Sequence, residues 1–159
     1  MGVVSYEMLV NSSVPPAKLY KASVLDADVL LPKLVPQAIK SIEILEGDGA
    51  PGTITKVTLG EGSQFKYMKH KVDAIDKENF TFSHTVFEGD MLMNVIEKIT
   101  YDIKFEQSPD GGSICKEGCK YYTIGDYELN IEQLKAAKER RLGLFKAIEA
   151  YILANPDTF

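Results

Sequence analysis

Apolar and polar side chains alternate almost without interruption between residues 39 and 122, and this pattern limits the fold more than any other feature of the chain. Successive side chains of a β-strand point to opposite faces of a sheet, so a period of two predicts strands with one buried face. The segments between the alternating runs are short and rich in Gly, Asp, Asn and Pro, which is typical of tight turns. We expect strands at about 3–10, 39–45, 53–60, 65–74, 79–87, 95–106 and 112–122. Strands joined by such turns indicate an antiparallel meander.

The period changes in the C-terminal part of the chain. Apolar residues recur at spacings of three and four over residues 131–152, and the cations Lys138 and Arg141 fall within the same stripe. Asn130 followed by Gln133 resembles a capping box, which would begin a helix here. About 23 residues would make a helix of roughly 34 Å, long enough to cross a curved sheet.

Two shorter helices are expected between the first strand and the meander. Pro15-Pro16 suits the opening of the first, and the second covers about residues 27–33 and ends before Pro36. The helices are therefore segregated from the strands along the chain, which predicts an α+β fold. We expect one domain over residues 1–159, with a strongly curved seven-stranded antiparallel sheet that grips the long helix.

Composition and charge exclude several classes of partner. The chain has 159 residues with 18 Lys and Arg against 23 Asp and Glu, a net charge of −5. An acidic chain without a basic run is poorly suited to bind nucleic acid or an anionic membrane. No segment approaches the ~20 apolar residues needed to span a bilayer, and no signal-like leader precedes the first strand. We therefore expect a cytoplasmic protein without membrane contact, and RNA is a disfavoured partner.

The two cysteines, Cys115 and Cys119, lie on one predicted strand. Their Cα atoms would be ~13 Å apart there, too far for a disulfide. Without a nearby His they also form a weak metal site. We expect reduced thiols, no metal and no cofactor.

A glycine-rich loop at residues 47–52 has the spelling of a dinucleotide-binding turn. Gly47, Gly49 and Gly52 match G-x-G-x-x-G, but such a turn needs a helix after it so that phosphate meets the helix N-terminus. Residues 53–59 are instead rich in β-branched side chains and alternate in polarity. The loop is therefore interpreted as a strand–strand connection whose glycines supply positive φ angles.

Several segments together carry a resemblance to a known family. The segments are EILEGDGAPGTITKVTLGEG, NFTFSHTVFEGD, IEKITYDIKF and the late Glu149-Ala150-Tyr151. They resemble the plant pathogenesis-related class 10 family, the family of the major birch-pollen allergen, and the resemblance covers essentially the whole chain. It implies a helix-grip fold: seven antiparallel strands around the C-terminal helix, two short helices beneath its end, and a large, partly apolar cavity between sheet and helix.

The resemblance also implies a function. Members of the family are cytosolic proteins, associated with defence and stress, that bind flavonoids, cytokinins and other hormones, sterols, fatty acids and alkaloid-like compounds. We therefore expect a monomeric carrier for a small hydrophobic or amphipathic metabolite. Two alternatives stay open: a metal-independent ribonuclease of plant defence, and an enzyme of the same fold that transforms a metabolite.

The alternation itself offers a concave wall for such a ligand. Phe82, His84 and Val86 share one side of their strand, and Tyr101 falls on the inner side of the following strand. Apolar walls with a few polar groups suit a flat amphipathic ligand, although a packed core would show the same pattern. The residues expected to line the site are Asp28, Leu31, Ile39, Val57, Leu59, Phe65, Tyr67, His70, Phe82, His84, Val86, Ile99, Tyr101, Lys138 and Leu142.

Three of these residues carry open questions. His84 stands where related sequences usually have Tyr, which gives the cavity a group that can donate, accept or become a cation. The phase of the strand that holds His70 is undetermined, because one bulge would invert it, and a structural role is the default for this side chain. Lys138 would lie either at the cavity mouth or with its ammonium group in solvent.

The ribonuclease alternative rests on four residues that match positions discussed for the family. Glu97 and Glu149 would act as general base and acid, Lys56 would steady the phosphate, and Tyr151 would assist. The competing hypothesis for Glu97 is structural: its carboxylate would accept hydrogen bonds from the glycine loop and hold that loop in place.

Overall fold

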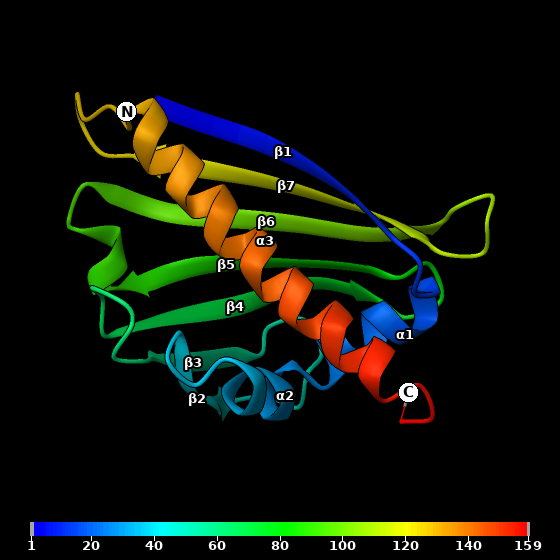
Figure 1. Cartoon of the computed structure of the whole chain (residues 1–159). Helices are drawn as coiled ribbons and strands as arrows, with labels where there is room; N and C mark the ends of the chain where they lie inside the picture. The colour runs from blue at the N-terminus through cyan, green and yellow to red at the C-terminus, as the bar shows by residue number, and fades with distance from the viewer. Residues whose placement is uncertain (1, 159) are drawn as a thin grey trace.

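The computed structural model describes residues 2–158 and shows a seven-stranded antiparallel sheet curved around one long helix (Figure 1). The strands are β1 (Gly2–Ser12), β2 (Ile39–Glu46), β3 (Ile54–Leu59), β4 (Tyr67–Asp76), β5 (Thr81–Gly89), β6 (Ile96–Gln107) and β7 (Ser113–Thr123). Their order in the sheet is β1-β7-β6-β5-β4-β3-β2, so six consecutive strands form the meander and β1 joins it beside β7. The predicted α+β helix-grip architecture is confirmed.

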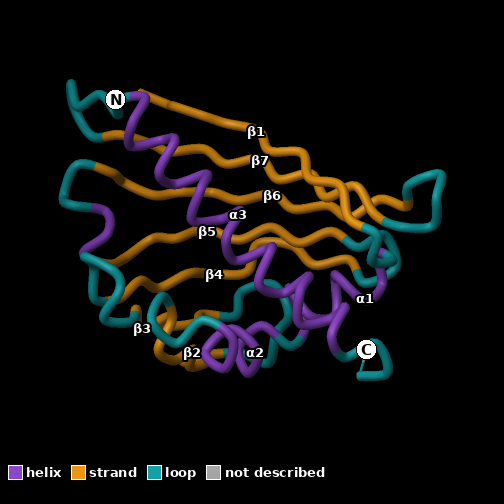
Figure 2. The backbone as a smooth tube through the Cα atoms, in the orientation of Figure 1, coloured by secondary structure: helices purple, strands orange, loops and turns teal. Residues whose placement is uncertain are grey.

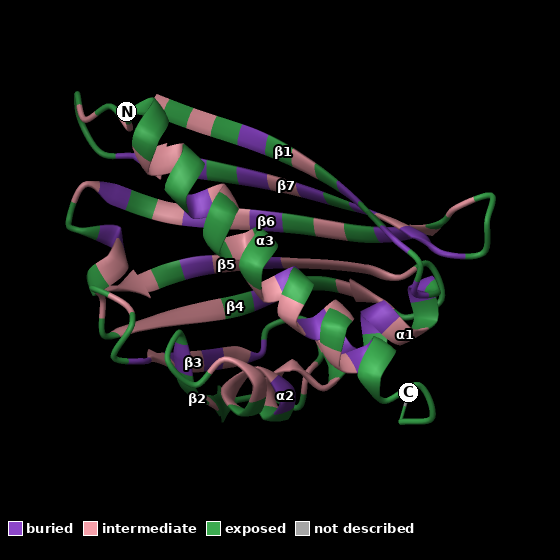
Figure 3. Cartoon of the chain, in the orientation of Figure 1, coloured by how far each residue is buried: buried purple, intermediate pink, exposed green. Residues whose placement is uncertain are grey.

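The long helix α3 (Ile131–Ala154) runs diagonally across the concave face of the sheet (Figure 2). It begins with the predicted capping box: the Gln133 amide donates to Asn130 Oδ1 at 2.8 Å, and the Asn130 amide donates to Gln133 Oε1 at 2.9 Å. These two bonds satisfy amides that a helix N-terminus would otherwise leave without partners. Buried and exposed residues recur in turn along α3 (Figure 3), and its fully buried side chains are Ala137, Phe145, Ile148 and Ile152.

The short helices lie under the C-terminal part of α3. They are α1 (Pro16–Tyr20), its continuation as the π-helical turn η1 (Lys21–Leu25), and α2 (Ala27–Leu34). The helix α2 ends two residues before Pro36, because a residue that precedes proline is disfavoured in the helical region. The remaining element is the short 3-10 turn η2 (Asp90–Leu92) between β5 and β6.

Two clusters of buried side chains fill the space between α3 and the sheet. The first lies under the C-terminal half of α3 and includes Leu19, Tyr20, Phe105 and Phe145. The second lies under the N-terminal half and consists of Tyr6, Val86, Leu92, Ile96, Ile99, Tyr101, Cys119, Tyr121 and Ala137. The interior is therefore divided along the axis of α3.

The glycine-rich loop is the connection between β2 and β3, as predicted. Gly47, Gly49 and Gly52 have φ angles of 94°, 104° and 96°, a region that L side chains rarely adopt. Thr53 organises the loop: its hydroxyl accepts from the Gly49 amide at 2.9 Å and donates to the Ala50 carbonyl at 2.6 Å. The Gly52 amide donates to Val72 of β4, so the loop is tied to the sheet as well.

The expected role of Glu97 in this loop is wrong. A bulge interrupts the pairing of β6 with β7 between Ile96 and Lys98, and it shifts the phase of the strand at that point. Ile96 and Ile99 are both buried, whereas Glu97 is exposed. Thr53 and β4 hold the loop, and simple alternation from residue 95 onward could not have located the bulge.

Candidate functional site

The register of the sheet gathers polar side chains at the centre of its concave face. His84 pairs with Tyr101, Tyr101 with Cys119, and Cys119 with Tyr6, so one row of side chains crosses four strands. The rings of His84 and Tyr101 are stacked with centroids 4.9 Å apart and planes inclined by 14°. All four residues are buried, so the row lies inside the protein, beneath α3.

His70 of β4 pairs with Val86 and lies diagonally next to His84. Its ring centroid lies 4.9 Å from that of His84, so the strand presents His70 to the interior and the undetermined phase is resolved. Burial, with a smaller contribution from Arg141, lowers the pKa of His70 to about 4. Burial, followed by the charges of His70 and Arg141, lowers the pKa of His84 well below its ordinary value. Both imidazoles are therefore neutral at pH 7.

An ion pair connects α3 to the sheet just beside the row. Arg141 Nε and Nη2 both donate to Oε1 of Glu117 on β7, at 3.0 Å and 2.5 Å. The guanidinium carbon also lies 4.7 Å from the centroid of the Tyr101 ring. Burial alone would lower the pKa of Arg141, but the Glu117 carboxylate outweighs it and raises the pKa. Arg141 is thus charged, and its contact with Glu117 lies between the two clusters of buried side chains.

The buried cysteines and tyrosines of the inner face are uncharged at neutral pH. Burial raises the pKa of both Cys115 and Cys119 to about 12, and both are free thiols. Burial likewise raises the pKa of Tyr6 and Tyr101. Thiols in this state are poor nucleophiles, so the pair does not suggest redox or covalent chemistry.

In the next row of the inner face, Glu117 is buried and the three apolar residues are half-buried. This row runs from Phe82 through Ile103 and Glu117 to Met8 across four strands. Phe82 of β5, Ile103 of β6 and Met8 of the edge strand β1 keep accessible surface on this face. All three pack against the cluster under the C-terminal half of α3, and the apolar surface that they keep is available to a small molecule at the level of the ion pair.

Four polar atoms of the site are buried without a hydrogen-bond partner among the described residues. They are the Tyr6 hydroxyl, Nδ1 of His70, Nδ1 of His84 and Oε2 of Glu117. Buried polar atoms are usually paired, so unpaired ones beside accessible apolar surface are candidates for contact with a bound molecule. An apolar wall with a few such atoms is the composition of a small-molecule site.

Many of the predicted lining residues do share this inner face. Val86 and Ile99 are almost fully buried beside His84 and Tyr101, and Val57 and Ile39 are buried on β3 and β2. Leu59 pairs with Ile39, and Leu31 packs from α2 against the cluster under the C-terminal half of α3.

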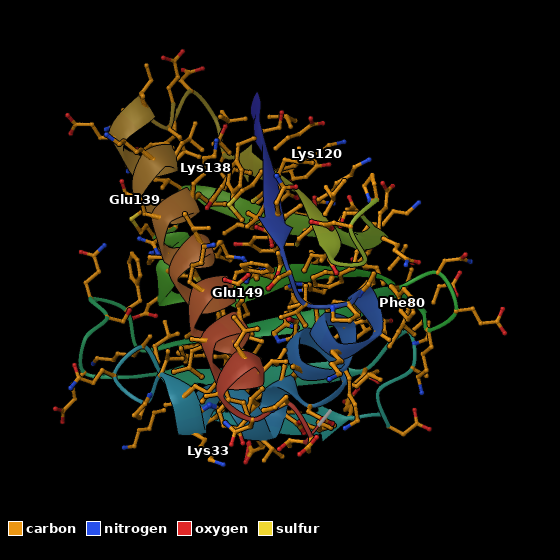
Figure 4. All side chains as sticks on the ribbon, turned by 45° about the vertical axis from the view of Figure 1, so that its right-hand side comes forward. Lys33, Phe80, Lys120, Lys138, Glu139 and Glu149 are labelled. Carbon is orange, nitrogen blue, oxygen red and sulfur yellow. The ribbon has the colours of Figure 1, made fainter. Side chains whose placement is uncertain are left out.

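Lys138 lies toward the N-terminal end of α3 and Glu149 further toward its C-terminus (Figure 4). The Lys138 ammonium group is 5.6 Å from the centroid of the Tyr6 ring, so this side chain reaches the inner face.

Other predicted lining residues lie elsewhere. Tyr67 pairs with Thr58 on the outer face, and its hydroxyl donates to Glu88 at 3.2 Å, because it is on the opposite side of β4 from His70. Leu142 is 36% exposed on the flank of α3. Asp28 is half-buried in the first turn of α2, and Phe65 is half-buried in the loop before β4.

The four residues of the ribonuclease hypothesis are not brought together. Glu97 follows Ile96, which pairs with Thr123 at one end of β7, whereas Glu149 lines a hollow of about 550 Å³ together with Ser113 at the other end. About ten residues of strand, roughly 30 Å, separate these places.

The other two members of that set are also apart. Lys56 lies on the outer face, with its ammonium group 5.4 Å from the Tyr67 ring. The Tyr151 hydroxyl accepts from Lys33 of α2 at 3.2 Å. These positions cannot surround a single phosphodiester.

Glu117 and Arg141 form the charged centre of the site, and neither is among the lining residues predicted from the sequence. A signal was present: Glu117 alternates in phase with Cys115, Cys119 and Tyr121, so the strand places an acid on its apolar side. Arg141 falls within the apolar stripe of the helix. A buried acid on a strand and a partly buried base on a helix are each costly, and together they indicate a pair.

The described part of the chain offers neither a metal site nor a spanning helix. No group of three His, Cys, Asp or Glu side chains in it could hold a metal ion. Within residues 2–158, no helix combines the length and the apolar character that crossing a membrane requires.

Comparison with known proteins gives consistent matches over the whole chain. The profile described as the Pathogenesis-related protein Bet v 1 family matches residues 1–155. The major allergen Pru ar 1 of Prunus armeniaca is 59% identical over 159 residues, which cover 100% of this chain and 99% of the relative. The crystal structure of Ara h 8.0201 is similar with a TM-score of 0.86 and 45% identity, over 96% of this chain and 99% of that one.

A more distant similarity concerns the fold alone. Norcoclaurine synthase from Thalictrum flavum, in complex with dopamine and hydroxybenzaldehyde, has a TM-score of 0.74 at 19% identity and covers 96% of this chain and 88% of its own.

Proposed function

The chain belongs to the pathogenesis-related protein Bet v 1 family, and we propose that it binds and carries a small amphipathic molecule between its curved sheet and α3. The carrier is proposed to be a cytosolic monomer of the defence or stress response, in line with the family resemblance. The ligand class includes flavonoids, hormones, sterols and alkaloid-like compounds.

The observation that carries this proposal is the accessible surface in the row formed by Phe82, Ile103, Glu117 and Met8, which we call the half-open row. Phe82, Ile103 and Met8 offer apolar surface there, and the unpaired atoms of His84 and Glu117 lie beside it. Such a combination supports a ligand with an apolar body and a polar group. The similarity in fold to a synthase that holds two small aromatic molecules points in the same direction.

The expected affinity is modest. Burial of about 200 Å² of apolar ligand surface at ~25 cal/mol per Å² contributes roughly 5 kcal/mol. Two hydrogen bonds at about 1 kcal/mol each bring the total to roughly 7 kcal/mol before the costs of ordering the ligand, so we expect micromolar affinity.

Displacement of an uncharged fluorescent probe, N-phenyl-1-naphthylamine, tests the proposal. We expect saturable binding of the probe and its competitive displacement by members of a plant-metabolite panel. Cleavage of total RNA is assayed in parallel with wild type and the Glu97→Ala/Glu149→Ala variant. Absence of saturable probe binding, together with RNA cleavage that the double variant lacks, would replace the carrier with the ribonuclease.

A further inference from the structure

We propose that the interior selects against anionic ligands, takes uncharged or cationic aromatic ones, and owes this preference to Glu117. The inference rests on the proposed function, because it concerns the ligand of the same site. It goes further in assigning a charge class to the ligand and a specificity-determining role to one side chain.

Arg141 is the cation that an anionic ligand would be expected to meet at the level of the half-open row. Its Nε and Nη2 atoms are both directed at Glu117 Oε1, and one face of its guanidinium group covers the Tyr101 ring. Planar guanidinium groups recognise carboxylates through paired N–H donors of this kind. The Nε–Nη2 edge is therefore already used by a carboxylate of the protein itself.

Glu117 also places a carboxylate beside the accessible apolar surface of the half-open row. Its side chain is only 4% exposed and lies in the row between Ile103 and Met8, which are both partly accessible. Oε1 takes both bonds from Arg141, while Oε2 has no partner among the described residues. An approaching carboxylate would meet a second carboxylate oxygen, whereas a hydroxyl or ammonium donor would find an acceptor.

The other titratable groups around the half-open row do not change this preference against anionic ligands. His70 and His84 are neutral at pH 7, and Tyr101 is uncharged. Lys138 is a further cation on the inner side of α3 and lies against the Tyr6 ring. A buried anion must be paired to offset its loss of hydration, so an interior with a self-neutralised Arg141 disfavours one.

Three probes with one naphthalene body separate charge from shape. They are 2-naphthol, 2-naphthoate and naphthalen-2-ylmethylammonium, each titrated by calorimetry at pH 7.5. For wild type we expect 2-naphthol and the ammonium probe to bind at least ten-fold more tightly than 2-naphthoate.

The variant Glu117→Gln releases Arg141 at nearly constant shape, so the affinity for 2-naphthoate should rise at least ten-fold and that for the ammonium probe should fall. The double variant Glu117→Gln/Arg141→Gln has no charge at the site and should still reject 2-naphthoate while it keeps 2-naphthol. Lys135→Met removes a cation at an exposed position of α3 and is the matched control, which should leave the order of the three probes unchanged. Circular dichroism and thermal melting establish that each variant is folded.

The outcomes are distinct. Equal binding of 2-naphthol and 2-naphthoate to wild type would overturn the charge selection but leave the carrier function intact. A folded Glu117→Gln variant that still rejects 2-naphthoate would overturn the role of Glu117. If Glu117→Gln does not fold, the double variant Glu117→Gln/Arg141→Gln decides the role of Glu117. That role would be overturned if wild type rejects 2-naphthoate and the double variant binds it. Failure of all three probes to bind wild type would contradict the proposed function itself, and the inference with it.

Discussion

Two neutral histidines in contact make the centre of this protein sensitive to acid. His70 and His84 lie with ring centroids 4.9 Å apart, and the pKa of each is lowered because burial disfavours the charged imidazole. The unfolded chain binds protons at its histidines near pH 6.5, whereas folded His70 does so only near pH 4. Acid therefore favours the unfolded state.

The sign and window of this effect give a prediction. Stability should be unaffected by these groups above pH 6.5 and should fall as the pH decreases from 6.5 toward 4. At pH 5, 1.5 units below the unfolded pKa, His70 alone should lower the free energy of unfolding by about 2 kcal/mol, at 1.36 kcal/mol per unit. Urea unfolding at pH 7 and pH 5 measures the difference.

The variant His70→Phe/His84→Phe is the control for this prediction. In this variant the free energy of unfolding should change much less between pH 7 and pH 5 than in wild type. The carboxyl groups with lowered pKa values, such as Asp76 and Glu88, titrate below this range and do not contribute to the difference. An equal loss in wild type and variant would show that other groups govern the pH dependence.

At the scale of elements, the loop between β2 and β3 shows how one hydroxyl organises a tight connection. Thr53 is buried and bonds both the Gly49 amide and the Ala50 carbonyl. A Cβ atom added to Gly47 would lie 2.5 Å from Thr53 Oγ1 and 2.9 Å from Thr53 Cα, whereas one added to Gly49 would meet nothing within 4 Å. The two glycines therefore share a backbone requirement but differ in packing.

This difference predicts unequal effects of alanine at the two positions. Gly49→Ala should destabilise the protein by about 1 kcal/mol, since an L residue is strained at its positive φ. Gly47→Ala should cost about 3 kcal/mol, because the added methyl group also displaces Thr53. Urea midpoints measured at an unchanged m-value test the order, and equal losses would mean that the Thr53 contact does not constrain the loop.

At the scale of the whole molecule, Phe82, Ile103 and Met8 keep accessible apolar surface on the inner face of the sheet, where the proposed ligand would lie. The protein should gain stability when a ligand covers this surface. Ligand at one hundred times its dissociation constant contributes about 2.7 kcal/mol, which for a domain of this size raises the melting temperature by roughly 5–10 °C.

Covering this surface with a side chain of the protein should abolish this gain. Ile103→Trp places a larger ring on the inner face of β6, and Lys104→Trp is a matched control because its side chain is on the outer face of the same strand. Differential scanning fluorimetry with 2-naphthol should show a ligand-dependent shift for wild type and Lys104→Trp only. A full shift in Ile103→Trp would place the ligand elsewhere.

The amino-acid sequence by itself determined the elements and their order. Alternation, turn residues, the Asn130–Gln133 capping box and Pro36 are local signals, and local backbone preferences act on neighbouring residues whatever the rest of the chain does. The inner positions of His84 and Tyr101 follow from the same alternation, since both strands keep a regular register there.

Only the tertiary structure decided the phase at irregular positions and the chemistry of the centre. The bulge beside Glu97 depends on the pairing of β6 with β7, and no local pattern marks it. Arg141 and Glu117 are 24 residues apart on a helix and a strand, and their pairing depends on how α3 is seated across the sheet. The charge state of the interior is a property of that contact, because a buried guanidinium group is available to a ligand only when no carboxylate of the protein has already paired with it.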